Sequence, residues 1–152
     1  MPNDFLATLI TFGSGGMAGA LITAYATNIR NRRELALKLA DRYIAAMFEK
    51  VRIAREAMES PTRMADHTQW NSVVAVANWY ELVASCYLNG SADGRILTEL
   101  GLIQKATDFY QLMRNAKQTQ DGQQVPAFDE DTLGRLKKLQ ALVTGATPYS
   151  AY

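Results

Sequence analysis

The chain has 152 residues, which is enough for one domain of ordinary size. A net charge of +1 excludes a nucleic-acid binder by overall charge. With one cysteine, Cys86, an intrachain disulfide is excluded, and Cys86 and the single histidine, His67, are too few ligands for a zinc site. We therefore expect no nucleic-acid partner, no metal and no cofactor.

Residues 5–29 are 25 consecutive residues without a charged side chain, and the stretch ends at Arg30. A helix rising about 1.5 Å per residue needs roughly 20 apolar residues to cross a bilayer core of about 30 Å. Hydroxyl side chains and four glycines lower the hydropathy of the stretch, so a buried helix of a soluble protein is an alternative. A signal peptide is a further alternative, but its basic residues should precede the apolar run. We expect a transmembrane helix over residues 1–29.

The charges that flank this stretch predict its orientation. Arg30, Arg32 and Arg33 follow it, whereas Asp4 is the only charged side chain before it. Basic residues near the ends of a span stay in the cytoplasm. Residues 30–63 also carry nine basic and five acidic side chains, a balance that suits anionic lipid headgroups. We expect the three arginines at the membrane surface, the N-terminus outside the cell and the C-terminal domain in the cytoplasm.

Small residues cluster in the middle of the expected span. Gly15 and Gly19 have GxxxG spacing, and Gly16, Ala20 and Ala24 extend a ridge of small side chains at intervals of four. Such ridges let helix backbones approach closely in a membrane, although small residues are also simply common in spans. We expect these five residues to form the interface of a homo-oligomer.

Residues 30–60 predict a long amphipathic juxtamembrane helix that continues from the span. Its apolar face has the spacing of three and four residues that a helix requires. The face consists of Ala36, Ala40, Tyr43, Met47, Val51, Ala54 and Met58, widened by Leu37, Ile44 and Phe48. It can pack onto the protein's own bundle or onto a second copy. Ser60 and Pro61 end the helix, because a residue before proline avoids helical dihedral angles.

Residues 67–88 are apolar almost all round and predict the central helix of the C-terminal domain. Asp66 or Thr68 can cap its N-terminus. The polar residues of this helix form one narrow stripe that contains Glu81. The stripe is either a solvated edge, or Glu81 is buried and paired with an arginine, so that its removal would be costly.

The rest of the chain predicts two more helices and no strand. We expect a turn at residues 89–94, a helix at about 95–119 with a bend or close crossing at Gly101, a polar linker at 118–126, a last helix at 128–145 and a tail at 146–152. The expected fold is all-α. A transmembrane helix at 1–29 continues into a juxtamembrane helix at 30–60, and a cytoplasmic bundle at 61–145 contributes three further helices.

Three segments carry a resemblance to a known family: VANWYEL at residues 76–82, the NGSADG turn, and FYQLMRNAK at residues 109–117. With them the chain resembles small bacterial membrane proteins of the domain of unknown function 4760 type, which are similar in plan to phage abortive-infection proteins. The resemblance implies an inner (plasma) membrane location, and no enzymatic activity follows from it. It places an aromatic-acidic element on Tyr80 and Glu81 and an aromatic-basic element on Phe109, Tyr110 and Arg114. Glu81 and Arg114 are therefore candidates for a buried polar or partner site.

Three functions were weighed on these observations. The first is a membrane-anchored helical module that self-associates and binds a protein partner through its bundle, with a phage- or defence-linked role implied by the resemblance alone. The second is an oligomeric pore or holin-like protein, since the span is rich in glycine and hydroxyl residues. An enzyme is not expected, because His67 and Glu81 lie about 21 Å apart along one helix and cannot act together in one chain.

Overall fold

The computed structural model describes residues 3–121, 123–128 and 133–145, but not the side chains of residues 3–22, 65 and 118–120. The chain is predominantly helical, which confirms the all-α fold class. In order, the elements are α1 (Asn3–Arg42), a π-helix (Tyr43–Met47), α2 (Phe48–Met58), a 3₁₀ helix (Arg63–Ala65), α3 (His67–Leu88), α4 (Gly94–Glu99), α5 (Leu102–Asn115), β1 (Lys117–Gln120), β2 (Gln123–Pro126) and α6 (Gly134–Val143).

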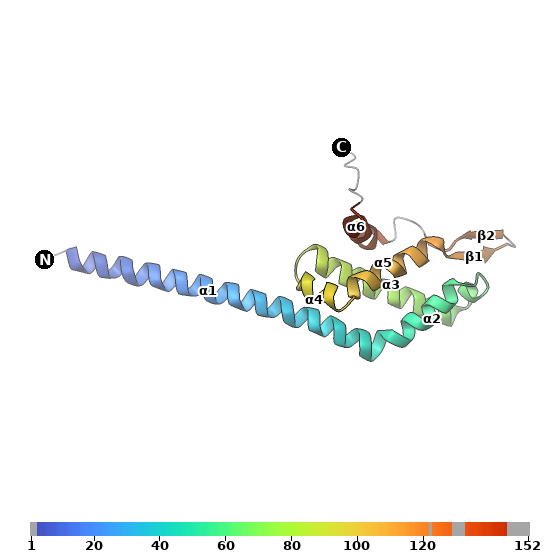
Figure 1. Cartoon of the computed structure of the whole chain (residues 1–152), viewed down its shortest axis with the longest axis horizontal. Helices are drawn as coiled ribbons and strands as arrows, with labels where there is room; N and C mark the ends of the chain where they lie inside the picture. Colours follow the sequence, from blue (N-terminus) through green and yellow to red (C-terminus); the bar gives the residue numbers. More distant parts are fainter. Residues whose placement is uncertain (1–2, 122, 129–132, 146–152) are drawn as a thin grey trace, which may run out of the picture.

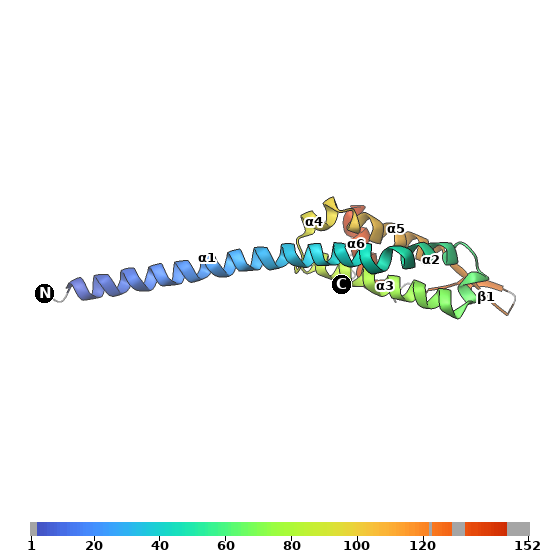
Figure 2. The same cartoon turned by 90° about the horizontal axis from the view of Figure 1, so that it is seen from below.

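α1 is a rod that extends beyond one end of the helical bundle (Figures 1 and 2). Its 40 residues correspond to about 60 Å of helix, and only its C-terminal part lies beside the other helices. The chain bends at the π-helix, where α2 begins. A π-helical turn is one of the few ways in which a helix without proline bends sharply.

No helix in the described part of the chain combines the length and the apolar character that crossing a membrane requires.

α3 is the central helix, as the sequence predicts, and it packs against α2, α5 and α6. Tyr80 of α3 and Phe109 of α5 are the largest of the fully buried side chains, and their ring centroids lie 5.1 Å apart. The N-terminus of α3 is capped by Asp66, whose Oδ1 accepts hydrogen bonds from the amides of Thr68 and Gln69 at 2.8 and 3.1 Å. Cys86 is buried.

The single helix expected at residues 95–119 is wrong, because the structure divides it into α4 and α5. Gly101 separates them with a φ of 71°, a left-handed conformation that residues with a Cβ rarely adopt. α4 starts at a cap of its own, since Asp93 Oδ1 accepts hydrogen bonds from the amides of Arg95 and Ile96. Among the residues that the structure describes, four α-helices therefore follow α2, and not the expected three.

The expectation of a structureless polar linker is wrong as well, because residues 117–126 form a β-hairpin. β1 and β2 are antiparallel, with Lys117 opposite Pro126. Asp121, which follows β1, has a φ of 50°, and Asp-Gly is the residue pair that two-residue hairpin turns favour. The amide of Ala127 donates to the carbonyl of Ala116 at 3.0 Å and closes the base of the hairpin.

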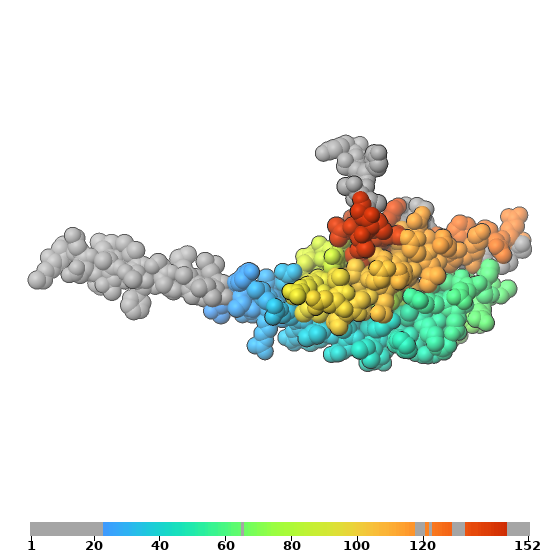
Figure 3. Space-filling model, viewed as in Figure 1, coloured from blue at the N-terminus to red at the C-terminus, as the bar shows by residue number. Residues whose placement is uncertain are grey.

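α6 begins later than the expected residue 128 and lies on the outside of the bundle (Figure 3). The acidic residues 129–131 that were expected at its N-terminus lie outside the described residues. Phe128, which precedes them, stacks on Trp70 of α3 with a centroid distance of 5.2 Å. Leu136 and Leu139 are fully buried and hold α6 against α3 and α5.

Candidate functional site

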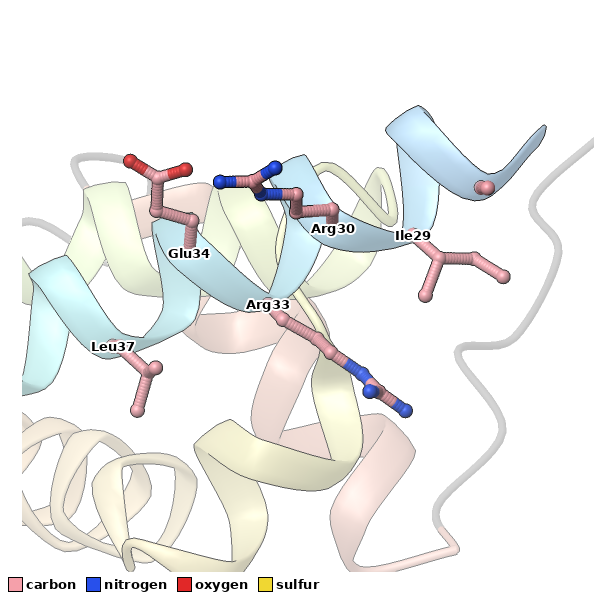
Figure 4. Close-up of a pocket in the computed structure, with 6 residues that line it drawn as sticks. Ile29, Arg30, Arg33, Glu34 and Leu37 are labelled. Carbon is pink, nitrogen blue, oxygen red and sulfur yellow. The ribbon is translucent and has the colours of Figure 1, made fainter. Parts of the chain in front are cut away.

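A shallow groove of about 490 Å³ runs along α1 near the point where the rod leaves the bundle. Its lining consists of Ala26, Ile29, Arg30, Arg33, Glu34 and Leu37. Figure 4 shows Arg30 and Glu34 pointing to one side of the helix, and Ile29, Arg33 and Leu37 to another. The groove therefore combines an apolar floor with charged edges.

The charges at this groove are partly paired. Lys38 Nζ lies 2.8 Å from Glu34 Oε1, and this hydrogen bond is the main reason why the pKa of Glu34 is lowered. Arg33 Nε lies 3.7 Å from Asp93 Oδ2 and so joins α1 to the loop between α3 and α4. Both pairs are largely exposed to solvent, where ion pairs contribute little to stability. Arg30 takes part in none of the described ion pairs.

The same side of the rod exposes large apolar side chains. Leu37 of α1, Ile44 of the π-helix and Phe48 at the start of α2 are 52%, 74% and 62% exposed, and we call these three residues the free face. Large exposed apolar side chains that lie together on a soluble protein usually mark a site of interaction.

The opposite face of the rod is covered by the bundle. Ala36 and Leu39 are buried, and Met47 and Val51 continue the buried face through the π-helix into α2. Of the two expected locations for this apolar stripe, packing onto the protein's own bundle is confirmed. The free face is thus the part of the predicted apolar surface that remains uncovered.

The residues expected at an oligomer interface are mostly beyond what the structure describes. The side chains of Ala20 and of the preceding residues Gly15, Gly16 and Gly19 lie outside the described set, and Ala24 is exposed.

The three arginines expected at a membrane surface differ in their surroundings. Arg30 and Arg33 are exposed, whereas Arg32 is half-buried. The Nε of Arg32 is buried and has no hydrogen-bond partner among the residues that the structure describes, and its guanidinium lies close to Gly90 in the loop between α3 and α4. Arg32 therefore faces the bundle, and Arg30 and Arg33 face solvent.

Glu81 joins two helices that are far apart in sequence. It is partly buried on α3, and its Oε1 accepts a hydrogen bond of 2.9 Å from the amide of Leu136 in the first turn of α6. The first amides of a helix have no partner within the helix, and a negative charge there complements the helix dipole. Glu81 is thus the cap of α6, supplied from another helix.

Arg114 is exposed and does not form an ion pair with Glu81 within the part of the chain that is described. It lines a groove of about 380 Å³ between α5 and α6, together with Tyr110, Gln111, Lys137, Gln140, Ala141 and Thr144. The two residues singled out as one polar site therefore serve different purposes. Glu81 positions α6, and Arg114 lies on the surface that α6 helps to form.

Sequence reasoning missed a line of aromatic rings that connects the π-helix to the core. Tyr43 lies 5.4 Å from Trp79, and Trp79 lies 4.8 Å from Tyr80, measured between ring centroids. Lys105 Nζ lies 5.6 Å from the centre of the Tyr43 ring, within the range of a cation–π contact. Burial is the main cause that raises the pKa of Tyr80, and the nearby Tyr43 hydroxyl raises it further. No described group meets the distance and angle of a hydrogen bond to the Tyr80 hydroxyl, so the contact with Tyr43 is a weak one. A π-helix has no sequence signature that would have indicated this arrangement.

The described residues offer surfaces for association, namely the free face and the groove between α5 and α6. No group of three or more His, Cys, Asp or Glu side chains among them has the arrangement that a metal ion needs. His67 is exposed at the start of α3, and Cys86 is buried. Comparison of the chain with known protein families, curated proteins and solved structures gave no match.

Proposed function

We propose that this chain is a membrane-anchored helical interaction module that self-associates along α1 and binds a protein partner through its bundle. The observation that carries the proposal is the contrast between the two faces of α1. One face packs on the bundle through Ala36 and Leu39, and the other leaves Leu37 and Ile44 exposed. A bundle that needed α1 only for its own stability would have no use for this second apolar face.

In this proposal residues 5–29 cross a bacterial inner (plasma) membrane, with the N-terminus outside and the bundle in the cytoplasm. The support is the 25-residue stretch without charge and the basic residues that follow it. Self-association then brings the free faces of parallel copies together. Covering a large exposed apolar side chain contributes about 1.5–3 kcal/mol, so Leu37 and Ile44 can supply much of the pairing energy.

The groove between α5 and α6 is the surface that we propose for a protein partner. It has a tyrosine and an arginine, Tyr110 and Arg114, which are residue types enriched at protein interfaces. Glu81 supports one wall of the groove by capping α6. A role in defence against phage rests on the family resemblance of the sequence alone.

Fractionation and labelling test the anchor and its orientation. The full-length chain should stay with membranes after washing with high salt and with carbonate. A Gln123→Cys variant, in a Cys86→Ala background, places a thiol on the exposed hairpin. An impermeant thiol reagent should reach it only after the cells are permeabilised. Labelling in intact cells would reverse the orientation, and release by carbonate would remove the anchor.

Mass measurement in detergent tests self-association. The double variant Leu37→Gln, Ile44→Gln should form smaller assemblies than the wild type, because it removes two apolar side chains of the free face. Glutamine has a high helix propensity, so the helix itself should stay formed. The matched control is Leu142→Gln, Val143→Gln, which changes two exposed apolar residues on α6. If both double variants keep the wild-type mass, the free face is not the interface.

An oligomeric pore is the alternative function. The observation that favours it is the density of glycine and hydroxyl residues between Thr8 and Thr27, which would suit a polar lumen. Purified full-length chain in dye-loaded liposomes separates the two functions. Dye release that depends on protein concentration supports the pore, whereas intact liposomes with inserted protein support the interaction module.

A further inference from the structure

The end of the bundle from which α1 emerges is built around the loop between α3 and α4. The amide of Asp93 donates to the carbonyl of Arg32 at 3.0 Å, and the Asp93 carboxylate faces Arg33. Gly90 also lies against Arg32. Figures 1 and 2 place α4 at this same end. The loop is therefore level with Arg32 and Arg33, immediately after the uncharged stretch that ends at Ile29.

A second groove opens beside this loop. It measures about 260 Å³ and lies between the C-terminus of α3 and α6, with a lining of Ser85, Leu88, Asn89, Arg135 and Lys138. Arg135 and Lys138 are exposed, and neither forms one of the described ion pairs. Glu81, the carboxylate that precedes Ser85 on α3 by four residues, already accepts a hydrogen bond from the amide of Leu136. The groove thus presents two cations beside an exposed leucine.

The acidic side chains at this end are already occupied. Asp93 caps α4 and faces Arg33, and Glu34 is bonded to Lys38. Glu99 accepts a hydrogen bond of 2.8 Å from Arg95. Two described cations here, Arg135 and Lys138 on α6, form none of the described ion pairs, and Arg30 on the rod lies near Glu34, whose carboxylate is already bonded to Lys38.

We propose that this end of the bundle, formed by Leu88, Asn89, Arg135 and Lys138 together with Arg30, docks on the anionic phospholipid headgroups of the membrane. The proposal rests on the membrane anchor proposed above. The anchor brings this end of the bundle to the bilayer surface, where each basic residue strengthens association about fivefold. An acidic protein segment would find the same cations, but the position of the cations at the end from which α1 emerges favours the lipid surface.

Hydrogen–deuterium exchange of the full-length chain in lipid nanodiscs tests this docking. One set of discs contains phosphatidylcholine alone, and the other also contains phosphatidylglycerol. Amides of residues 85–89 and 134–140 should exchange more slowly in the anionic discs only. The double variant Arg135→Glu, Lys138→Glu should lose this difference, because removing two basic contacts lowers the docked population roughly 25-fold. The milder Arg135→Gln, Lys138→Gln variant should lose it too.

The matched control reverses two charges at the other end of the bundle, Arg63→Glu and Lys117→Glu, and should keep the difference between the two kinds of disc. If the wild-type chain inserts into both kinds of disc and its amides exchange at equal rates in the two, the docking proposal is overturned and the anchor proposal is not affected. Slower exchange with added polyglutamate, but not with anionic lipid, assigns the surface to an acidic protein segment and also overturns it. A chain that does not enter discs at all refutes the anchor, and the docking with it.

Discussion

Replacing Glu81 should loosen α6 from the bundle. The carboxylate accepts the amide of Leu136 at 2.9 Å across 55 positions of sequence, and it is the cap of α6 that the described residues provide. Loss of a helix N-cap costs about 1 kcal/mol, and a hydrogen bond to a charged group contributes about 1.5–3 kcal/mol. Because Glu81 is only partly buried, we expect Glu81→Ala to cost about 1–2 kcal/mol.

Thermal unfolding of the full-length chain in mild detergent, followed by far-ultraviolet circular dichroism, measures this loss. For a chain of this size 1 kcal/mol shifts Tm by about 2–4 °C, so a loss of about 1–2 kcal/mol lowers Tm by about 2–8 °C. Glu81→Gln keeps an acceptor oxygen without the charge and should cost about half as much. Glu56→Ala is the control, because Glu56 forms an exposed ion pair with Arg52 that contributes only a few tenths of a kcal/mol.

Hydrogen exchange adds a local readout to the same comparison. In Glu81→Ala the amides of the first turn of α6, Leu136 above all, should exchange faster, whereas those of the π-helix and α2 should not change. The reasoning is refuted if Glu81→Ala lowers Tm no more than Glu56→Ala and leaves exchange at Leu136 as it is in the wild type. That result would mean that the buried Leu136 and Leu139 side chains alone hold α6 in place.

Three further tests of the local structure use thermal unfolding of variants. Gly101→Ala should cost about 1 kcal/mol because its φ is 71°, whereas Gly134→Ala, with open space around the new Cβ, should be neutral or stabilising. Tyr80→Phe should not destabilise at neutral pH, and it should lose less stability above about pH 10, where an unfolded tyrosine ionises before the buried one with its raised pKa. Deleting Ala45 from the π-helix should cost less stability than deleting Lys38 from α1. A π-turn contains one residue more than an α-turn, so the first deletion can leave a regular α-helix. The second deletion rotates the residues on one side of position 38 by about 100° relative to those on the other side, and so moves the buried face away from the bundle.

Strong periodicity made the main helices predictable. The expected central helix at residues 67–88 has the bounds of α3, and the apolar stripe from Ala36 to Met58 is the buried face of the rod and of α2. Periodicity identifies which face of a helix is apolar, but it does not say what covers that face. For this reason the sequence alone could not show whether the apolar stripe packs on the protein's own bundle or on a second copy of the chain.

The features that sequence reasoning missed depend on contacts or on single backbone conformations. A glycine inside a helical pattern is compatible with a bend or with a complete break, and Gly101 makes the break. The strands of the hairpin are only four residues long and polar, so they lack the alternation that marks a strand, and the Asp-Gly pair at residues 121–122 was the one local signal. The bond from Glu81 to Leu136 joins two helices whose packing no local pattern specifies.

The glycines of α1 connect the proposed anchor to the proposed self-association. Most of the rod lies beyond the bundle, and helices in proteins gain most of their stability from tertiary packing. Four glycines between residues 13 and 19 weaken a helix in water by about 4 kcal/mol relative to alanine. Inside a bilayer an unpaired backbone amide is more costly than this, so the helix is favoured there. The same glycines then permit close contact with a second rod, and the exposed Leu37 on the same helix continues that contact below the membrane, so α1 can serve as both anchor and interface.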